Sequence, residues 1–188
     1  MNGKIKSVAV YCGHQLGHNP EYARDARRVG ELLARNKITL VFGGGKFGLM
    51  GTVASAALEN GGNVIGITTP HVVSLQEPIH KGINVKIVDG LSTRKEEMFD
   101  LSDAFVILPG GIGTLDEMTD IMTKQQVGES HKPIYMLNTA KYWKVFGQIM
   151  FHMQNEGFMK NPNDYHLHVV NTPEELIEKL VNGDDLVA

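Results

Sequence analysis

The sequence LPGGIGTLDE, at residues 108–117, places three glycines between an apolar run and a helical pattern. The run Ala104–Leu108 is typical of a strand that is buried on both faces, and the pattern from Thr114 predicts a helix. A strand, a glycine turn and a helix in this order form the repeating unit of an α/β protein. This stretch therefore predicts the class of the fold.

The same turn is suited to binding an anion. Glycine lets the chain turn sharply and lets a ligand approach the backbone N–H groups, and a helix N-terminus carries roughly half a positive charge. A phosphate is the expected anion. The residues expected to contact it are Gly110, Gly111, Ile112, Gly113 and Thr114.

Glu117 stands one turn into the predicted helix and has two interpretations. It is close enough to act on a ligand that the turn anchors. The spacing Thr114-x-x-Glu117 also fits a capping box, in which the glutamate accepts a hydrogen bond from the N–H of the cap residue. Spacing alone favours the capping box.

Length and composition favour one cytoplasmic domain. The chain has 188 residues, so a single domain over residues 1–188 is expected. The net charge is -3 and no block of Lys or Arg occurs, which argues against nucleic acid and membranes as partners. The start of the chain does not resemble a signal peptide, and Cys12, the single cysteine, can form no disulfide within the chain. A reducing cytoplasm is the expected location.

Apolar runs alternate with helical patterns along the chain, which predicts βα units around a doubly wound, mostly parallel sheet with helices on both faces. The seven predicted strands are Ser7–Tyr11, Thr39–Phe42, Asn63–Thr68, Asn84–Val88, Ala104–Leu108, Pro133–Leu137 and His168–Val170. The predicted helices are Pro20–Arg35, Leu49–Asn60, Thr93–Ser102, Thr114–Val127, Lys141–Glu156 and Pro173–Leu180. The stretch Pro70–Gly82 is expected to be a loop over a site.

A second glycine loop, Gly43–Gly48, follows the predicted strand Thr39–Phe42 and matches the pattern G-x-G-x-x-G. A dinucleotide site also needs an acidic residue at the end of the next strand, where Ile67–Pro70 has none. A Walker loop is excluded because no Gly-Lys-Ser/Thr occurs. Two glycine loops at strand ends suit a mononucleotide or a sugar phosphate, with Gly44 and Gly45 as candidate contacts.

Arg94 and Lys95 stand in the first turn of the predicted helix Thr93–Ser102, where the helix dipole disfavours cations. One interpretation is that neighbouring glutamates and water solvate both side chains on an exposed face. The other is that a bound anion recruits them. The second interpretation gains support because the next strand ends at the Gly110 turn, which puts both motifs on one rim.

The sequence gives little support to metal or cofactor chemistry. The eight histidines show no metal-ligand spacing such as H-E-x-x-H, so no metal is expected. No lysine carries a local signature for a Schiff base, and no cofactor is expected. Cys12 and His14 lack an orienting third group, so Cys12 is better interpreted as a small buried thiol than as a nucleophile.

Five motifs together resemble those of the Lonely Guy (LOG) family. They are Gly43-Gly44-Gly45, Gly48-Leu49-Met50-Gly51, Arg94-Lys95-x-x-Met98, Ser102-Asp103-Ala104-Phe105 and Pro109-Gly110-Gly111-x-Gly113-Thr114-x-x-Glu117. The resemblance implies a Rossmann-like fold, a homodimer and a cytokinin riboside 5'-monophosphate phosphoribohydrolase, an enzyme long mislabelled as lysine decarboxylase. The implied substrate is AMP or isopentenyladenosine monophosphate, cleaved at the N-glycosidic bond to free base and ribose 5-phosphate.

By position, the resemblance assigns Arg94 and Glu117 as the catalytic pair. In the implied reaction Glu117 activates water and stabilises positive charge on the sugar, while Arg94 fixes the phosphate. The resemblance also assigns substrate contacts to Glu77, Lys95 and Thr123. The departures from the family pattern, which bear on the choice of base, are His14-Gln15, Leu91-Ser92-Thr93 and Lys124.

Two other functions stay open at this point. Related proteins of the same fold bind molybdenum cofactor without hydrolysing anything, and glycine loops with a basic helix start would suit that anionic pterin. The other is a nucleosidase that accepts a broader range of purine or pyrimidine nucleoside 5'-monophosphates. A carrier would not need Arg94 and Glu117 together, and both are present.

Overall fold

The computed structural model describes residues 4–75, 83–159 and 165–182. Within these residues, seven strands form one sheet in the order β4-β3-β2-β1-β5-β6-β7, and every neighbouring pair is parallel. The strands are β1 (Ser7–Tyr11), β2 (Thr39–Phe42), β3 (Val64–Thr68), β4 (Asn84–Ile87), β5 (Ala104–Ile107), β6 (Ile134–Leu137) and β7 (Leu167–Val170). The predicted doubly wound, Rossmann-like α/β fold is confirmed.

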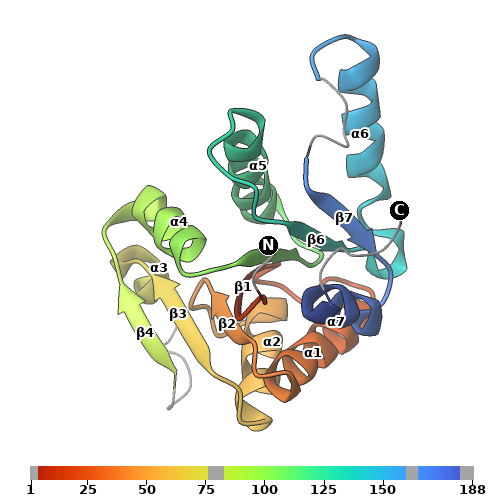
Figure 1. Cartoon of the computed structure of the whole chain (residues 1–188). Coiled ribbons are helices and arrows are strands. Elements are labelled where there is room, and N and C mark those ends of the chain that lie inside the picture. The colour runs from red at the N-terminus through yellow and green to blue at the C-terminus, as the bar shows by residue number, and fades with distance from the viewer. Residues whose placement is uncertain (1–3, 76–82, 160–164, 183–188) are drawn as a thin grey trace.

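Helices cover both faces of this sheet, as predicted (Figure 1). The described helices are α1 (Pro20–Arg35), α2 (Gly48–Glu59), α3 (Pro70–Leu75), α4 (Gly90–Asp100), α5 (Ile112–Gln126), α6 (Lys144–Asn155) and α7 (Pro173–Asn182). Helices α1, α2 and α7 pack on one face, and α4, α5 and α6 pack on the other. Figure 1 shows α6 extending beyond the sheet at the β7 side.

Alternate residues of β1 divide the core between these two layers. Val8 and Val10 contact the cluster formed with α1, α2 and α7, whereas Ala9 and Tyr11 contact the cluster formed with α4, α5 and α6. The alternation follows from the two-residue period of a strand. Because both faces of β1 are buried from Val8 to Tyr11, the sequence is apolar over these residues, and the strand was predictable from that run.

Two segments differ in secondary structure from the predictions. The first part of the predicted loop Pro70–Gly82 is the helix α3, and residues 76–82 lie outside the described residues. The predicted helix Lys141–Glu156 is divided into a 3-10 turn, η1 (Thr139–Lys141), and α6. The division follows from the left-handed backbone of Ala140 and Lys141, with φ values of 51° and 61°, which no α-helix can accommodate.

The order of the strands places a crevice at the carboxyl ends of β1 and β5. The chain proceeds from β1 towards β4 on one side of the sheet and from β5 towards β7 on the other, so these two neighbours flank the point where strand order reverses. Ligands of doubly wound proteins bind at this point. Here the N–H of Gly13 donates to the carbonyl of Pro109 over 3.0 Å, which joins the two strand ends.

Helices α1 and α2 approach each other closely at Gly30. A Cβ atom on this residue would collide with the carbonyl oxygen of Val53 and would lie 2.9 Å from Cβ of Ala56 and 3.0 Å from N of Ala57. Gly147, on α6, has no atom within 4 Å of the equivalent position. The two glycines therefore form a matched pair, one in a tight contact and one in open space.

We predict opposite effects of alanine at these two positions. Gly30→Ala overpacks the α1–α2 contact and lowers the free energy of unfolding by about 1–3 kcal/mol, whereas Gly147→Ala raises it by about 0.5–1 kcal/mol because alanine favours the helix. Thermal unfolding followed by circular dichroism measures both, at about 2–4 °C per kcal/mol for a chain of this size. Melting temperatures that move in the same direction would contradict the proposed contact.

Candidate active site

The Arg94 side chain is buried at the carboxyl edge of the sheet, where it joins three parts of the chain. Its Nε donates to the carbonyl of Ile67, in β3, over 3.0 Å. Its Nη1 donates to Oε1 of Glu117, on α5, over 2.9 Å. Gly43, at the end of β2, makes room for the guanidinium, since a Cβ atom at this position would collide with it. Sequence positions 43, 67, 94 and 117 therefore meet at one point.

Glu117 forms a buried ion pair with Arg94. The two side chains are 12% and 10% exposed, respectively. Burial raises the pKa of the Glu117 carboxyl above its ordinary value of 4.5, although the charge and hydrogen bond of Arg94 act in the opposite direction. Carboxyl groups that transfer protons in enzymes often have raised pKa values of this kind. Glu117 is therefore suited to act as a general base.

The predicted capping box is wrong. Helix α5 begins at Ile112, two residues earlier than predicted, with Gly111 as its N-cap. Thr114 is thus the third helical residue rather than the cap, and the Glu117 carboxylate is bound by Arg94. The Glu117 carboxylate therefore pairs with Arg94 and does not cap the start of α5.

The solvated-face interpretation of Arg94 is also wrong, because its guanidinium is buried. Helix α4 begins at Gly90, three residues earlier than predicted, so Arg94 and Lys95 lie beyond its first turn. Lys95 Nζ donates to Oδ1 of Asp120 over 3.1 Å and to Oδ1 of Asp116 over 3.3 Å. Burial alone would lower the pKa of Lys95, but these two hydrogen bonds raise it on balance. Lys95 thus remains a cation and connects α4 to α5.

The glycine turn before α5 presents backbone N–H groups to open space. The first four N–H groups of a helix lack intrahelical acceptors, and here they belong to residues 111–114. Gly111, the N-cap, has no side chain to satisfy them, and Cβ atoms at Gly111 and Gly113 would meet no atom within 4 Å. Thr114 is buried against Gly110, whereas Ile112 is 81% exposed. An anion can therefore approach this end of the helix directly.

The other candidate contacts lie at different distances from this turn. Gly44 has a φ of 80° and packs on Thr68, and Gly45 donates its N–H to Sδ of Met50 over 3.2 Å. Both glycines shape the loop that faces Arg94. Thr123 lies on the exposed part of α5, roughly 13 Å along the helix from Thr114, and its hydroxyl donates to a backbone carbonyl. Glu77 lies outside the described residues.

Two buried side chains at the end of β1 lie near the Glu117 charge. Burial raises the pKa of Tyr11 and that of Cys12, and the negative charge of Glu117 adds to both effects. Both groups therefore stay neutral at physiological pH. Cys12 is buried, which confirms its interpretation as a structural thiol, whereas His14 is exposed.

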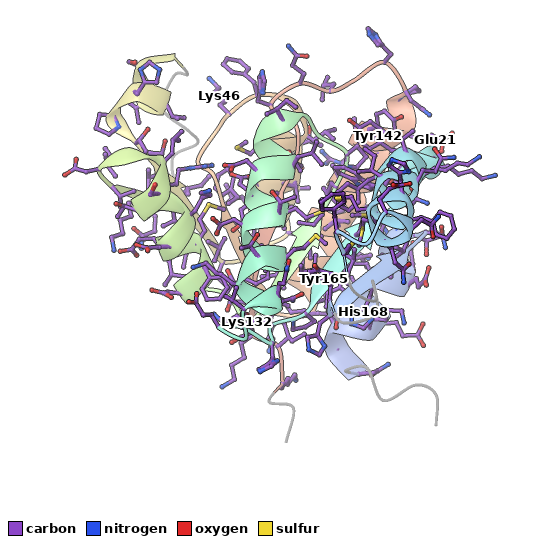
Figure 2. All side chains as sticks on the ribbon, turned by 90° about the horizontal axis from the view of Figure 1, so that it is seen from above. Glu21, Lys46, Lys132, Tyr142, Tyr165 and His168 are labelled. Atoms are coloured by element: carbon purple, nitrogen blue, oxygen red, sulfur yellow. The ribbon has the colours of Figure 1, made fainter. Side chains whose placement is uncertain are left out.

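The sequence analysis missed Tyr142, Asp116 and Asp120. The Tyr142 hydroxyl donates to the carbonyl of Gly110 over 2.6 Å, and Figure 2 shows this side chain near the same edge as Lys46, far from Lys132 at the opposite edge. Tyr142 lies at the start of the predicted helix Lys141–Glu156, and the local sequence gave no signal of this contact. Tyr142 also lines a cavity of about 230 Å³ beside the glycine turn, together with Tyr22 and the departures His14 and Gln15.

Further features of the described residues bear on metals and membranes. Across residues 4–75, 83–159 and 165–182, no group of three or more His, Cys, Asp or Glu side chains is placed to hold a metal ion. None of the helices described is both long enough and apolar enough to cross a membrane.

Comparisons with known proteins agree with this fold and these motifs. Solved structures of similar fold include the molybdenum cofactor carrier protein of Chlamydomonas reinhardtii, with 18% identity, a TM-score of 0.67 and coverage of 94% of this chain and 98% of that chain. The molybdenum cofactor binding protein of Rippkaea orientalis has 22% identity, a TM-score of 0.66 and coverage of 92% and 93%. At these identities the likeness concerns the fold alone.

Sequence relatives are much more similar. A cytokinin riboside 5'-monophosphate phosphoribohydrolase of Rhodococcoides fascians is 38% identical over 155 residues, which cover 82% of this chain and 78% of the relative. The enzyme LOG1 of Arabidopsis thaliana, of the same name, is 36% identical over 183 residues, covering 96% and 84%. The family model described as possible lysine decarboxylase matches residues 50–180. The chain therefore belongs to this family, which includes the Lonely Guy (LOG) phosphoribohydrolases.

Proposed function

We propose that the protein is a phosphoribohydrolase that hydrolyses the N-glycosidic bond of AMP or an N6-substituted adenosine 5'-monophosphate, such as isopentenyladenosine monophosphate. The observation that carries the proposal is the buried Glu117 carboxylate, held by Arg94 about one helical turn beyond an open glycine turn. The names of the relatives support the same reaction.

The glycine turn binds the 5'-phosphate of the substrate in this proposal. Its orphan N–H groups and the dipole of α5 favour an anion, and the open space at Gly111 and Gly113 admits it. The ribose then lies beside the first turns of α5, close to Glu117. Family positions supply the further proposed contacts, which are Glu77, Lys95 and Thr123.

The chemistry falls to Glu117. As the bond between C1' and the base nitrogen breaks, the base departs with the electron pair and positive charge develops on the sugar, which a nearby carboxylate stabilises. A water molecule attacks C1', and its proton passes to Glu117. The departing base takes up one proton from solvent and Glu117 returns its proton to solvent, so that ribose 5-phosphate and the neutral base are released and the carboxylate is restored. Arg94 fixes the phosphate in this proposal, as its family position implies, and it also holds the carboxylate in position, since its Nη1 and Nε donate to Glu117 and Ile67.

We also propose a cytoplasmic homodimer. The single cysteine suits a reducing compartment. Helix α6 exposes large apolar side chains, and Val145, Ile149 and Met153 follow one another at four-residue spacing along one face of the helix. Exposed apolar surface of this kind often marks a protein contact. A second copy of the chain would cover them.

We predict that the pure protein releases free base from AMP or isopentenyladenosine monophosphate, and that Glu117→Gln lowers turnover by at least about 10²- to 10⁴-fold. The amide oxygen of glutamine still accepts a hydrogen bond from Arg94, so the variant is expected to fold, which circular dichroism checks. Chromatographic detection of the base measures turnover.

The matched control for this prediction is Glu96→Gln, which removes one exposed carboxylate from the neighbouring helix α4. It should retain wild-type turnover. If the protein releases free base from none of the nucleoside monophosphates, the proposed enzymatic function is refuted. The carriage of a cofactor is then the alternative function. Near-normal turnover of folded Glu117→Gln would remove Glu117 from the mechanism.

The raised pKa of Glu117 predicts the acid side of the pH profile. A protonated carboxyl cannot accept the proton of water, so kcat/KM should fall as the pH decreases through a pKa above 4.5. The phosphate of the substrate also titrates, with a second pKa of about 6. A limb caused by the substrate would persist in the residual activity of Glu117→Gln, whereas a limb caused by Glu117 should disappear. An unchanged limb in the variant would contradict this assignment.

For the homodimer, Ile149→Glu should convert the dimer to a monomer, because a charge in the apolar contact would be desolvated without a partner. Light scattering after size-exclusion chromatography measures the mass. Lys144→Glu, a charge change at the start of the same helix, serves as the control. A wild-type protein that is monomeric at every concentration would disprove the proposed assembly.

A further inference from the structure

The peptide between Gly110 and Gly111 occupies a sensitive position in the glycine turn. Its N–H belongs to the N-cap of α5 and is the first of the orphan donors. Its carbonyl carries the opposite partial charge. Because glycines flank the peptide on both sides, the backbone restricts its orientation less than at any other pair of residue types. If this peptide rotated, it would turn the carbonyl oxygen towards the bound anion.

One side chain engages this carbonyl. The Tyr142 hydroxyl donates to the Gly110 oxygen over 2.6 Å, a short hydrogen bond. In a planar trans peptide the C=O and N–H groups point in opposite directions. A carbonyl fixed on the Tyr142 side therefore directs the Gly111 N–H away from Tyr142.

The position of Tyr142 is itself determined by contacts with other elements. Its ring packs edge-on against Tyr22 of α1, with centroids 5.5 Å apart. The Thr139 hydroxyl, in η1, donates to Oδ2 of Asp25 on α1 over 2.8 Å, and the N–H of Trp143 donates to Oδ1 of Asn138 over 2.9 Å. These bonds hold the residues on both sides of Tyr142, so its hydroxyl is placed before any ligand arrives.

We propose that Tyr142 is a positioning residue of the phosphate site, which holds the Gly110–Gly111 peptide with its N–H towards the substrate phosphate. The inference rests on the proposed function, because it assigns the phosphate to this turn. Tyr142 acts through the peptide and does not touch the reacting atoms. Tyr142 therefore strengthens the binding of the phosphate, and it does so by the same amount in the ground state and in the transition state.

The experiment compares Tyr142→Phe with Tyr22→Phe. Each variant removes one hydroxyl from the same pair of rings, and both leave the edge-on contact in place. A net hydrogen-bond contribution of about 1 kcal/mol corresponds to about five-fold in a binding constant. Tyr142→Phe should therefore raise KM for AMP, and the dissociation constant of ribose 5-phosphate, by about five-fold. Turnover should change little, since uniform binding affects KM rather than kcat.

Tyr22→Phe should change neither constant. Equal effects of the two variants, or a fall in kcat with unchanged KM and unchanged ribose 5-phosphate binding, would overturn the proposal in favour of a general role in packing. Ribose 5-phosphate binding is measured by calorimetry and needs no turnover. If the protein hydrolysed no nucleotide, the proposed function would fail. The calorimetric titration with ribose 5-phosphate would still decide the role of Tyr142. A wild-type protein that does not bind ribose 5-phosphate would also overturn the proposal.

Discussion

The topology of the sheet places β2, β3, α4 and α5 at the same edge, and the guanidinium of Arg94 connects them there. It bonds to the β3 backbone and to Glu117 on α5, and it lies over the glycine that ends β2. Removing a charge of this kind from water is costly, and the cost is offset only if its donors are satisfied by close acceptors. The carbonyl of Ile67 and the carboxylate of Glu117 provide these acceptors. Arg94 therefore helps to fix the position of α4 against α5, together with Lys95 and its two aspartates.

The site combines two different ways of handling charge. The fixed charges form pairs, Arg94 with Glu117 and Lys95 with Asp116 and Asp120. The helix start, in contrast, offers partial charges on N–H groups that have no protein side chain to cap them. In the proposed function, the phosphate of the substrate therefore meets backbone donors that no side chain of the protein already occupies. The Tyr142 hydroxyl acts on these donors through the peptide that it holds.

Periodicity predicted the sheet well, and it predicted the ends of helices poorly. The buried strands show as apolar runs, so β1 and β2 have the predicted bounds. Helices α4 and α5 begin earlier than predicted, with Asp89 and Gly111 as their N-caps. Gly111 has no side chain to signal a cap, whereas Asp89 is a residue type that favours N-caps and was an available signal. The backbone of Ala140, left-handed without a glycine, gives no signal in the sequence either.

The site was predicted only in part, because local sequence patterns do not report contacts between distant segments. Spacing placed Glu117 one turn into a helix, but a local pattern could not anticipate a partner 23 positions earlier in the chain. The family resemblance supplied the pairing of Arg94 with Glu117. It did not indicate Tyr142, whose relation to Gly110 depends on the turn η1 and on its bond to Asp25. Contacts between separate βα units were thus the part that sequence reasoning alone could not reach.

The buried pair also restricts how this sequence can change over evolutionary time. An apolar replacement of Glu117 alone would leave the Arg94 charge buried without its counterion, and the loss of Arg94 alone would do the same to the carboxylate. Either single substitution destabilises the fold, whatever its effect on the binding of a ligand. A descendant that gave up catalysis but kept the fold would be expected to lose both residues together, so the two positions should vary as a unit among its relatives.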